Sequence, residues 1–143
     1  MILPDINILI HAHNLESPLH QRAKLWWDQA LAGPIGVGIA WVTILGFIRI
    51  ATHRQILHNP MTPHEACSRI VEWLSLPHVH IALPAEGHFA RLQKSLETLG
   101  TAGNLTTDAH LAALAMERGY VLCSTDVDFA RFANLKWINP LLC

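Results

Sequence analysis

Short apolar runs alternate along this chain with segments whose apolar residues recur every three or four positions. The runs at residues 35–40 and 120–123 have the length and composition of buried strands, and residues 78–82 alternate between apolar and polar. Shorter runs at residues 1–3 and 136–138 complete the set. Apolar strands separated by helical patterns predict an α/β fold whose parallel sheet is covered by helices on both faces.

Helix start and stop signals frame several of the intervening segments. Ser17-Pro18 begins one helix and Gly33 ends it, while Thr62-Pro63-His64-Glu65 is a capping box. We expect Thr106 or Thr107 to cap a later helix that is buried on most sides, with an apolar stripe that includes Met116. The predicted helices cover residues 7–13, 18–32, 41–52, 63–74, 85–99, 104–118 and 126–132.

Composition narrows the class of protein. A length of 143 residues predicts one domain, residues 1–143, and 51% hydrophobic against 15% charged residues excludes a disordered chain. The formal net charge of −1 excludes a strongly basic nucleic-acid footprint, so any RNA or DNA would need a local patch or a metal ion. The three cysteines are widely spaced and form no C-x-x-C, which favours a reduced, cytoplasmic setting.

No membrane segment is expected. Residues 30–48 carry no charge, but Gly33-Pro34, Gly36 and Gly38 interrupt the run, so a strand followed by a helix explains it better. The N-terminus has no basic region and contains Asp5, which argues against a signal peptide.

Four of the five aspartates lie at element boundaries. Asp5 follows the first strand, Asp108 lies in the first turn of an apolar helix, and Asp126 and Asp128 follow the strand at 120–123. Each alone is explained by a turn, a helix N-terminus or an N-cap. Together, at one edge of a parallel sheet, they would repel one another unless a cation lay between them. Oxygen ligands suit Mg²⁺ or Mn²⁺, which can support displacement at phosphorus.

Five sequence blocks in order resemble the PIN-domain ribonucleases, and within them the VapC-like toxins of bacterial toxin–antitoxin pairs. The blocks are L-P-D-I-N at 3–7, G-F-I-R at 46–49, T-D-A-H-L-A-A-L-A at 107–115, S-T-D-V-D-F at 124–129 and W-I-N-P-L at 137–141. The resemblance implies an α/β/α sandwich around a mainly parallel sheet of four to five strands. It also implies an endoribonuclease, dependent on Mg²⁺ or Mn²⁺, that hydrolyses RNA with a metal-activated water.

The resemblance also assigns roles to the aspartates. It implies that Asp5 and Asp108 are metal ligands, that Asp126 completes the acidic pocket, and that Asp128 is a further ligand, directly or through water. Asp5, Asp108 and Asp126 form the expected catalytic set. The products would carry a 5′-phosphate and a 3′-hydroxyl.

Supporting residues follow from the same resemblance. Ser124 is expected to orient Asp5 or a metal-bound water, and Asn7 to support the ligands or position substrate. Many family members carry a glutamate near the central segment, but residues 41–47 contain no acid. Thr43 is the nearest polar group and could hold a water there, while the loss puts a second metal in doubt. Arg49 could bind a phosphate, pair with an acid of the pocket, or form a structural salt bridge.

The resemblance implies partners as well. They are an RNA substrate, a second copy of the chain in a homodimer, and a cognate antitoxin whose tail would place an arginine against the acidic pocket. The five tryptophans point to a self-interface or a partner groove. Arg131 and Lys136 could meet RNA near the pocket, whereas Arg91 and Lys94 belong by default to a solvated helix face.

Two other functions stay open at this stage. Phosphatase and receiver domains also group acids at strand ends, although the segment Asp5-Ile6-Asn7 lacks the second aspartate of the phosphatase type. A non-catalytic PIN-like module that binds RNA or protein is favoured slightly by the missing glutamate. The pair His78 and His80 could bind a soft metal, although a solvated strand face is the simpler explanation.

Overall fold

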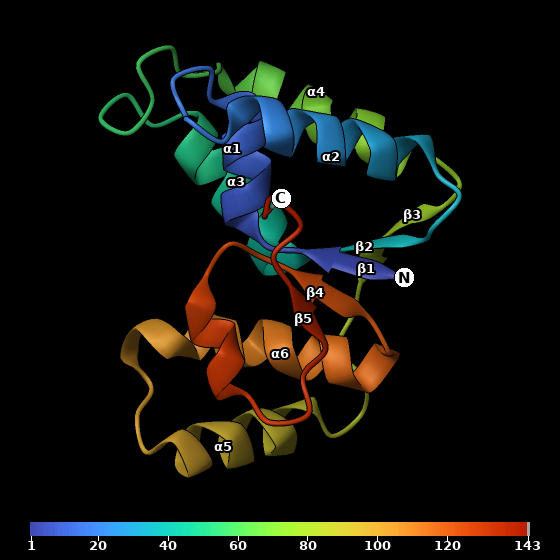
Figure 1. Ribbon diagram of the computed structural model, residues 1–143, viewed down its shortest axis with the longest axis vertical. Helices are drawn as coiled ribbons and strands as arrows, with labels where there is room; N and C mark the ends of the chain where they lie inside the picture. The colour runs from blue at the N-terminus through green and yellow to red at the C-terminus, as the bar shows by residue number, and fades with distance from the viewer. Residues whose placement is uncertain (143) are drawn as a thin grey trace.

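A five-stranded sheet separates two layers of helices in the computed structural model, which describes residues 1–142 (Figure 1). The strands pair in the order β3-β2-β1-β4-β5, and every pair is parallel. Their bounds are β1 (Ile2–Pro4), β2 (Val37–Ala40), β3 (Val79–Ala82), β4 (Val121–Cys123) and β5 (Trp137–Ile138). The predicted α/β class with a mainly parallel sheet is confirmed.

Four helices cover one face of the sheet and two cover the other (Figure 1). The first layer contains α1 (Ile6–His13), α2 (His20–Ala32), α3 (Trp41–Ala51) and α4 (Pro63–Leu74). The second contains α5 (His88–Leu99) and α6 (Thr106–Arg118), together with the 3₁₀ helices η1 (Gly103–Leu105) and η2 (Val127–Arg131). The α/β/α sandwich that the resemblance implied is present.

A separate hydrophobic core lies on each side of the sheet. In the first, Trp73 packs edge-on against Phe47 and Trp27, with ring centroids 5.0 Å and 5.3 Å apart. In the second, the alanines and leucines of α6 pack against Leu3 and Leu122. The predicted burial of α6 on most sides is confirmed, because Ala109 and Leu111 through Ala115 are all buried.

Several predicted details are wrong. Neither Thr106 nor Thr107 caps α6, because the short helix η1 runs directly into it and leaves Leu105 at the N-cap without a side-chain hydrogen bond. Met116 is 43% exposed rather than part of the buried stripe. Helix α5 begins at His88, three residues after the predicted start, because residues 85–87 form a turn.

Other local signals are confirmed. The Thr62 hydroxyl accepts from the Glu65 amide at 3.1 Å, the first bond of the predicted capping box, and donates to the Glu65 carboxylate at 3.2 Å. The uncharged run 30–48 divides into the end of α2, strand β2 and the start of α3. Across residues 1–142, no helix has both the length and the apolar character needed to cross a bilayer.

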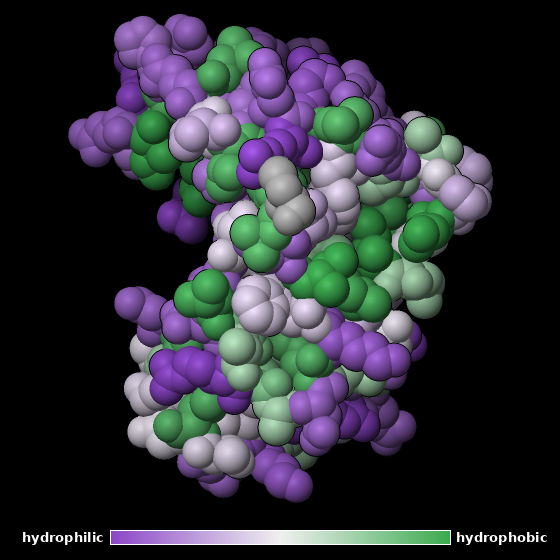
Figure 2. Space-filling model, viewed as in Figure 1, coloured by the Kyte–Doolittle hydropathy of each residue, from purple (hydrophilic) through white to green (hydrophobic). Residues whose placement is uncertain are grey.

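The order of the strands indicates which edge of the sheet is expected to bind a ligand. From β1 the chain moves to β2 and β3 on one side, and then crosses under the sheet through α5 and α6 to reach β4 on the other side. The strand order therefore reverses between β1 and β4, and ligands of open α/β sheets bind beyond the carboxyl ends of the strands at such a point. Figure 2 shows that the outline of the molecule is indented on the left, the side toward which β1 runs in Figure 1.

Candidate active site

Asp5 and Ser124 lie next to each other at the point where the strand order reverses. Pro4 is the register partner of Cys123, so the residue that follows each strand comes to the same level of the sheet. The Ser124 hydroxyl donates to Asp5 Oδ2 at 2.7 Å, and the Ile6 amide donates to Oδ1 at 2.7 Å. Burial raises the pKa of Asp5, and the nearby Asp126 charge adds to that rise, while the two hydrogen bonds oppose it.

Ser124 is fully buried and uses its whole hydrogen-bonding capacity. Besides donating to Asp5, its hydroxyl oxygen accepts from the Asp126 amide at 3.0 Å and from Asn7 Nδ2 at 3.2 Å. A hydroxyl has one donor and two acceptor sites, so no further partner is needed. The indole N–H of Trp137 holds the Ser124 carbonyl at 3.0 Å, a support that the sequence analysis missed.

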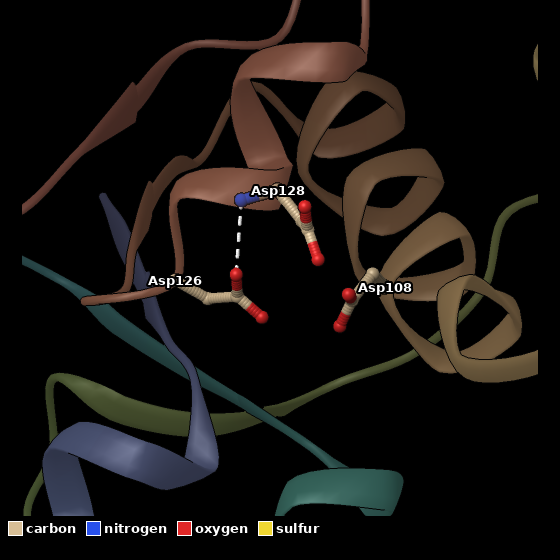
Figure 3. A group of neighbouring side chains, drawn as sticks. All are labelled: Asp108, Asp126 and Asp128. Atoms are coloured by element: carbon tan, nitrogen blue, oxygen red, sulfur yellow. Dashed lines mark hydrogen bonds between the residues drawn. The ribbon is translucent and has the colours of Figure 1, made fainter.

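Asp108, Asp126 and Asp128 direct their carboxylates into one space (Figure 3). One oxygen from each lies within 4.8 Å of the other two. Asp126 is the N-cap of η2, where its Oδ1 accepts from the Asp128 amide at 2.9 Å, and Asp108 lies in the first turn of α6. Burial and the charges of Asp5, Asp126 and Asp128 raise the pKa of Asp108 to about 6.

The donor set of this cluster fits a hard divalent cation. Among residues 1–142, no other group of three or more His, Cys, Asp or Glu side chains comes close enough to hold a metal ion. All three donors are carboxylate oxygens, the ligands that Mg²⁺ and Mn²⁺ prefer. A cation between them would also relieve the repulsion that raises the pKa of Asp108. Asp5 is not part of this closest group, although its charge acts on Asp108.

Thr43 and Arg49 lie on α3 and have different surroundings. Thr43, in the first turn after β2, is 1% exposed, and its hydroxyl has no hydrogen-bond partner among the described residues. Arg49, near the other end of the helix, is exposed and forms no ion pair within residues 1–142. A salt bridge, one of the alternatives for Arg49, is therefore absent from the described chain, and the binding of a phosphate by Arg49 stays a prediction.

The histidine pairs do not form a metal site. His78 Nε2 bonds to the Ala30 carbonyl at 3.1 Å and His80 Nε2 bonds to the Tyr120 hydroxyl at 2.6 Å, so the two rings engage different partners. His110, two residues after Asp108, turns toward α5, where its Nδ1 lies 2.8 Å from His88 Nε2. No local pattern in the sequence predicts that contact between the two helices.

Comparison with known proteins agrees with the fold. The model of the PIN domain family matches residues 2–135. The chain belongs to the PIN-domain family. It is 41% identical to Ribonuclease VapC33 of Mycobacterium tuberculosis over 99% of both chains. It is also 38% identical to Ribonuclease VapC37 of the same organism, over 98% of this chain and 97% of that protein.

Solved structures extend the comparison to the fold. A toxin–antitoxin complex from Klebsiella pneumoniae superposes on this PIN domain with a TM-score of 0.65 at 18% identity, covering 98% of both chains. Because the chain belongs to the PIN-domain family, the phosphatase-domain and receiver-domain alternatives are excluded.

Proposed function

We propose that this protein is a metal-dependent endoribonuclease and the toxin of a toxin–antitoxin pair, with residues 1–143 acting as one domain. The observation that carries the proposal is the group of Asp108, Asp126 and Asp128 at the reversal point of the sheet. The relatives named ribonucleases, which share 41% and 38% of their sequence with it, support RNA as the substrate.

Asp108, Asp126 and Asp128 would hold Mg²⁺ or Mn²⁺, with Asp5 as a further ligand beside them. The bound cation would lower the pKa of a water molecule and offset negative charge on the phosphate. Asp5, fixed by Ser124 and Ile6, would orient that water, and its buried carboxylate could accept a hydrogen bond from it. Asn7 would position the substrate or support Ser124, to which it donates at 3.2 Å.

The overall step is hydrolysis of one phosphodiester bond. The water oxygen forms a bond to phosphorus while the bond from phosphorus to the 3′-oxygen breaks. The departing oxygen takes up a proton, so one fragment ends in a 3′-hydroxyl and the other begins with a 5′-phosphate. No covalent intermediate with the protein is required.

The experiment incubates antitoxin-free protein with total cellular RNA and Mg²⁺ or Mn²⁺ and maps the new 5′ ends. We expect discrete cuts that disappear with EDTA and in Asp108→Asn. Asp28→Asn is the matched control, since Asp28 is exposed on α2 and pairs only with Lys24 at 2.6 Å. Cleavage that persists in Asp108→Asn would contradict the site assignment.

One observation favours a second candidate, a non-catalytic RNA- or protein-binding module. Residues 41–47 hold no acid, and the buried Thr43 stands in the segment where many relatives carry a glutamate. RNA binding that EDTA leaves unchanged, without cleavage, would support the module and overturn the nuclease.

Two protein partners belong to the proposal. A cognate antitoxin would bind the toxin in the cytoplasm, as the toxin–antitoxin complex among the structural neighbours illustrates for its own chains. A homodimer would bury the apolar side of α3, where Trp41 is 51% and Leu45 is 61% exposed one turn apart. Trp41 is exposed, whereas the other four tryptophans are buried or half-buried.

A further inference from the structure

A groove of about 330 Å³ lies between α5, α6 and η2, and the last two of these elements also carry Asp108 and Asp128. In Figure 1 these segments form the lower layer, with α5 and the orange-red η2 both lying against α6. Hydrophobic and hydrophilic residues are intermingled over this lower part of the surface in Figure 2. The groove is lined by Arg91, Lys94, Ser95, Thr98, Leu99, Ala113, Met116, Arg131, Phe132 and Ala133.

The lining has an unusual balance of charge for a chain with a net charge of −1. It includes Arg91, Lys94 and Arg131 but no acidic side chain among the described residues. Arg91 forms an ion pair with Glu117 at 3.2 Å, whereas Lys94 and Arg131 form no ion pair within residues 1–142. These two cations are therefore available to an anion.

A second groove, between α2 and α4, shows the contrast. It also holds two cations, but Lys24 lies 2.6 Å from Asp28 and Arg69 lies 3.7 Å from Glu72. The charges of that groove are balanced within the protein. The groove beside α5 instead brings Lys94 and Arg131, which form no ion pair within residues 1–142, together with an apolar floor.

The floor of the groove suits the flat face of a base. Leu99, Ala113 and Met116 supply apolar surface, and the Met116 side chain is 43% exposed although α6 is otherwise largely buried. A methionine can adjust its shape and its sulfur packs well against aromatic rings. Single-stranded nucleic acid binds where cations follow its backbone and such surfaces accept its bases.

The groove also lies at a useful distance from the acidic cluster. Arg131 ends the same 3₁₀ helix that carries Asp128, and residues three apart in such a helix lie on the same side. Met116 is eight residues beyond Asp108 on α6, which corresponds to about 12 Å along the helix. A strand whose phosphate reached the aspartates could therefore continue into the groove.

We propose that this groove, defined by Lys94, Met116 and Arg131, binds the single-stranded RNA segment next to the cleaved phosphate. The inference rests on the proposed ribonuclease function and adds the part of the surface that holds the substrate. Lys94 and Arg131 contact backbone phosphates, and a base lies over Met116. The cations also offset the repulsion between RNA and the neighbouring carboxylates.

Binding is measured in the Asp108→Asn background with a fluorescent single-stranded RNA pool of about twelve nucleotides, by anisotropy across a series of salt concentrations. The double variant Lys94→Ala with Arg131→Ala should lose two phosphate contacts. The steepness with which the log of the RNA association constant falls against log salt should then decrease by about 1.4, which is roughly a 25-fold loss of affinity at 0.1 M salt. The control pair, Arg22→Ala with Arg54→Ala, removes two exposed cations elsewhere and should keep most of the affinity.

The apolar floor is tested separately. Met116→Glu should weaken RNA binding at least as much as the loss of one of the two cations, because it adds a negative charge and removes the contact with the base. Leu25→Glu, at a 60% exposed position on α2, should leave binding unchanged. Met116→Leu should retain most of the affinity.

Cleavage by the same groove variants in the wild-type background separates the two proposals. Normal RNA binding and cleavage in all groove variants would overturn the groove and leave the nuclease intact. Absence of RNA binding in the Asp108→Asn parent would overturn the groove, and a lack of cleavage would overturn the function as well. Unchanged RNA binding with loss of a dimer in Met116→Glu would assign the groove to a second copy of the chain and overturn the RNA proposal.

Discussion

The Ser124 hydroxyl donates a 2.7 Å hydrogen bond to Asp5 Oδ2, across 119 residues of sequence. The bond joins the ends of β1 and β4, the two strands between which the sheet reverses its order. It also gives a buried carboxylate one of its two hydrogen bonds, and so opposes the effect of burial on the pKa of Asp5. The Ser124 side chain therefore links the pairing of β1 with β4 to the pKa of Asp5 in the candidate site.

Replacing Ser124 tests that coupling. Ser124→Ala should leave the fold in place and lower RNA cleavage or metal affinity by about 10- to 100-fold, as is typical when a group that supports metal ligands is lost. Loss of the bond also leaves Asp5 less well solvated in a buried site, at a cost of about 1–3 kcal/mol. Cleavage rates against Mg²⁺ concentration, with thermal unfolding, measure both effects. The exposed Ser75 gives the control Ser75→Ala, and equal behaviour of the two variants would contradict a role for Ser124.

The raised pKa of Asp108 predicts a pH effect on the metal-free protein. Its folded pKa is about 6, above the ordinary 3.8, so the folded state keeps a proton that the unfolded chain has already lost. Stability from this group is present at low pH and is lost as pH rises from about 4 to 6. Asp108→Asn should therefore stabilise the protein above pH 6 and have little effect below pH 4.

The size of that effect is modest because Asp108 is only half-buried and water screens its charge. We expect about 1 kcal/mol, or roughly 3 °C in melting temperature, in EDTA at pH 7. Mg²⁺ should raise the melting temperature of the wild type and not that of Asp108→Asn. A variant less stable than the wild type at pH 7 in EDTA would contradict the assigned repulsion.

Thr43 predicts opposite effects on stability and activity. Its buried hydroxyl has no partner among the described residues, so Thr43→Val should stabilise the metal-free protein by about 1 kcal/mol. If the hydroxyl holds a water at the site, the same change should slow cleavage. Thr101→Val, at an exposed position outside the helices, is the control. Unaltered cleavage together with higher stability would remove Thr43 from the site.

The sequence predicted the layers and the acidic edge because their signals are local. Apolar strands separated by helices are typical of a parallel sheet. In a parallel sheet the loops after residues 3 and 123 both lie at the carboxyl ends of the strands, so they come to the same edge. An N-cap is one of the explanations that the sequence offers for Asp126, and in the structure its carboxylate does accept from the Asp128 amide.

Contacts between distant segments gave no such signal. The short helix η1 replaced a threonine cap on α6, since it continues directly into the longer helix. Met116 has apolar spacing like its neighbours, but it faces a groove formed by α5 and η2. The support of Ser124 by the Trp137 indole depends on how β5 pairs with β4, which the residue pattern does not specify.

Glu117 anchors α5, a helix without a single buried residue. Its carboxylate, only 1% exposed, accepts from the Ala85 amide at 3.1 Å and from His88 Nδ1 at 2.5 Å, with Arg91 3.2 Å away. Burial alone would raise the pKa of Glu117, but the hydrogen bonds from Ala85, His88 and Arg91 and the charge of His88 outweigh it and lower the pKa.

Glu117→Gln should therefore destabilise the protein by about 2 kcal/mol at pH 7, because hydrogen bonds to a charged group are lost. A depressed pKa gives stability that is present above the ordinary value of 4.5 and disappears as pH falls through the folded pKa. The difference between variant and wild type should therefore shrink below pH 4. Hydrogen exchange should show faster opening of residues 88–99 in the variant, and Glu86→Gln, at an exposed position in the preceding turn, should show none.

The exposed apolar side of α3 predicts the oligomeric state. Trp41 and Leu45 lie one turn apart and are 51% and 61% exposed, so two large apolar side chains are neighbours on the surface of this helix. Light scattering on the wild type should give twice the chain mass of 15.9 kDa. Leu45→Glu should give the single-chain mass, since it places charge in the centre of the proposed interface, while Leu25→Glu, 60% exposed on α2, should keep the dimer. A monomeric wild type would contradict the dimer, and a Leu45→Glu variant that stays dimeric would place the interface on another face.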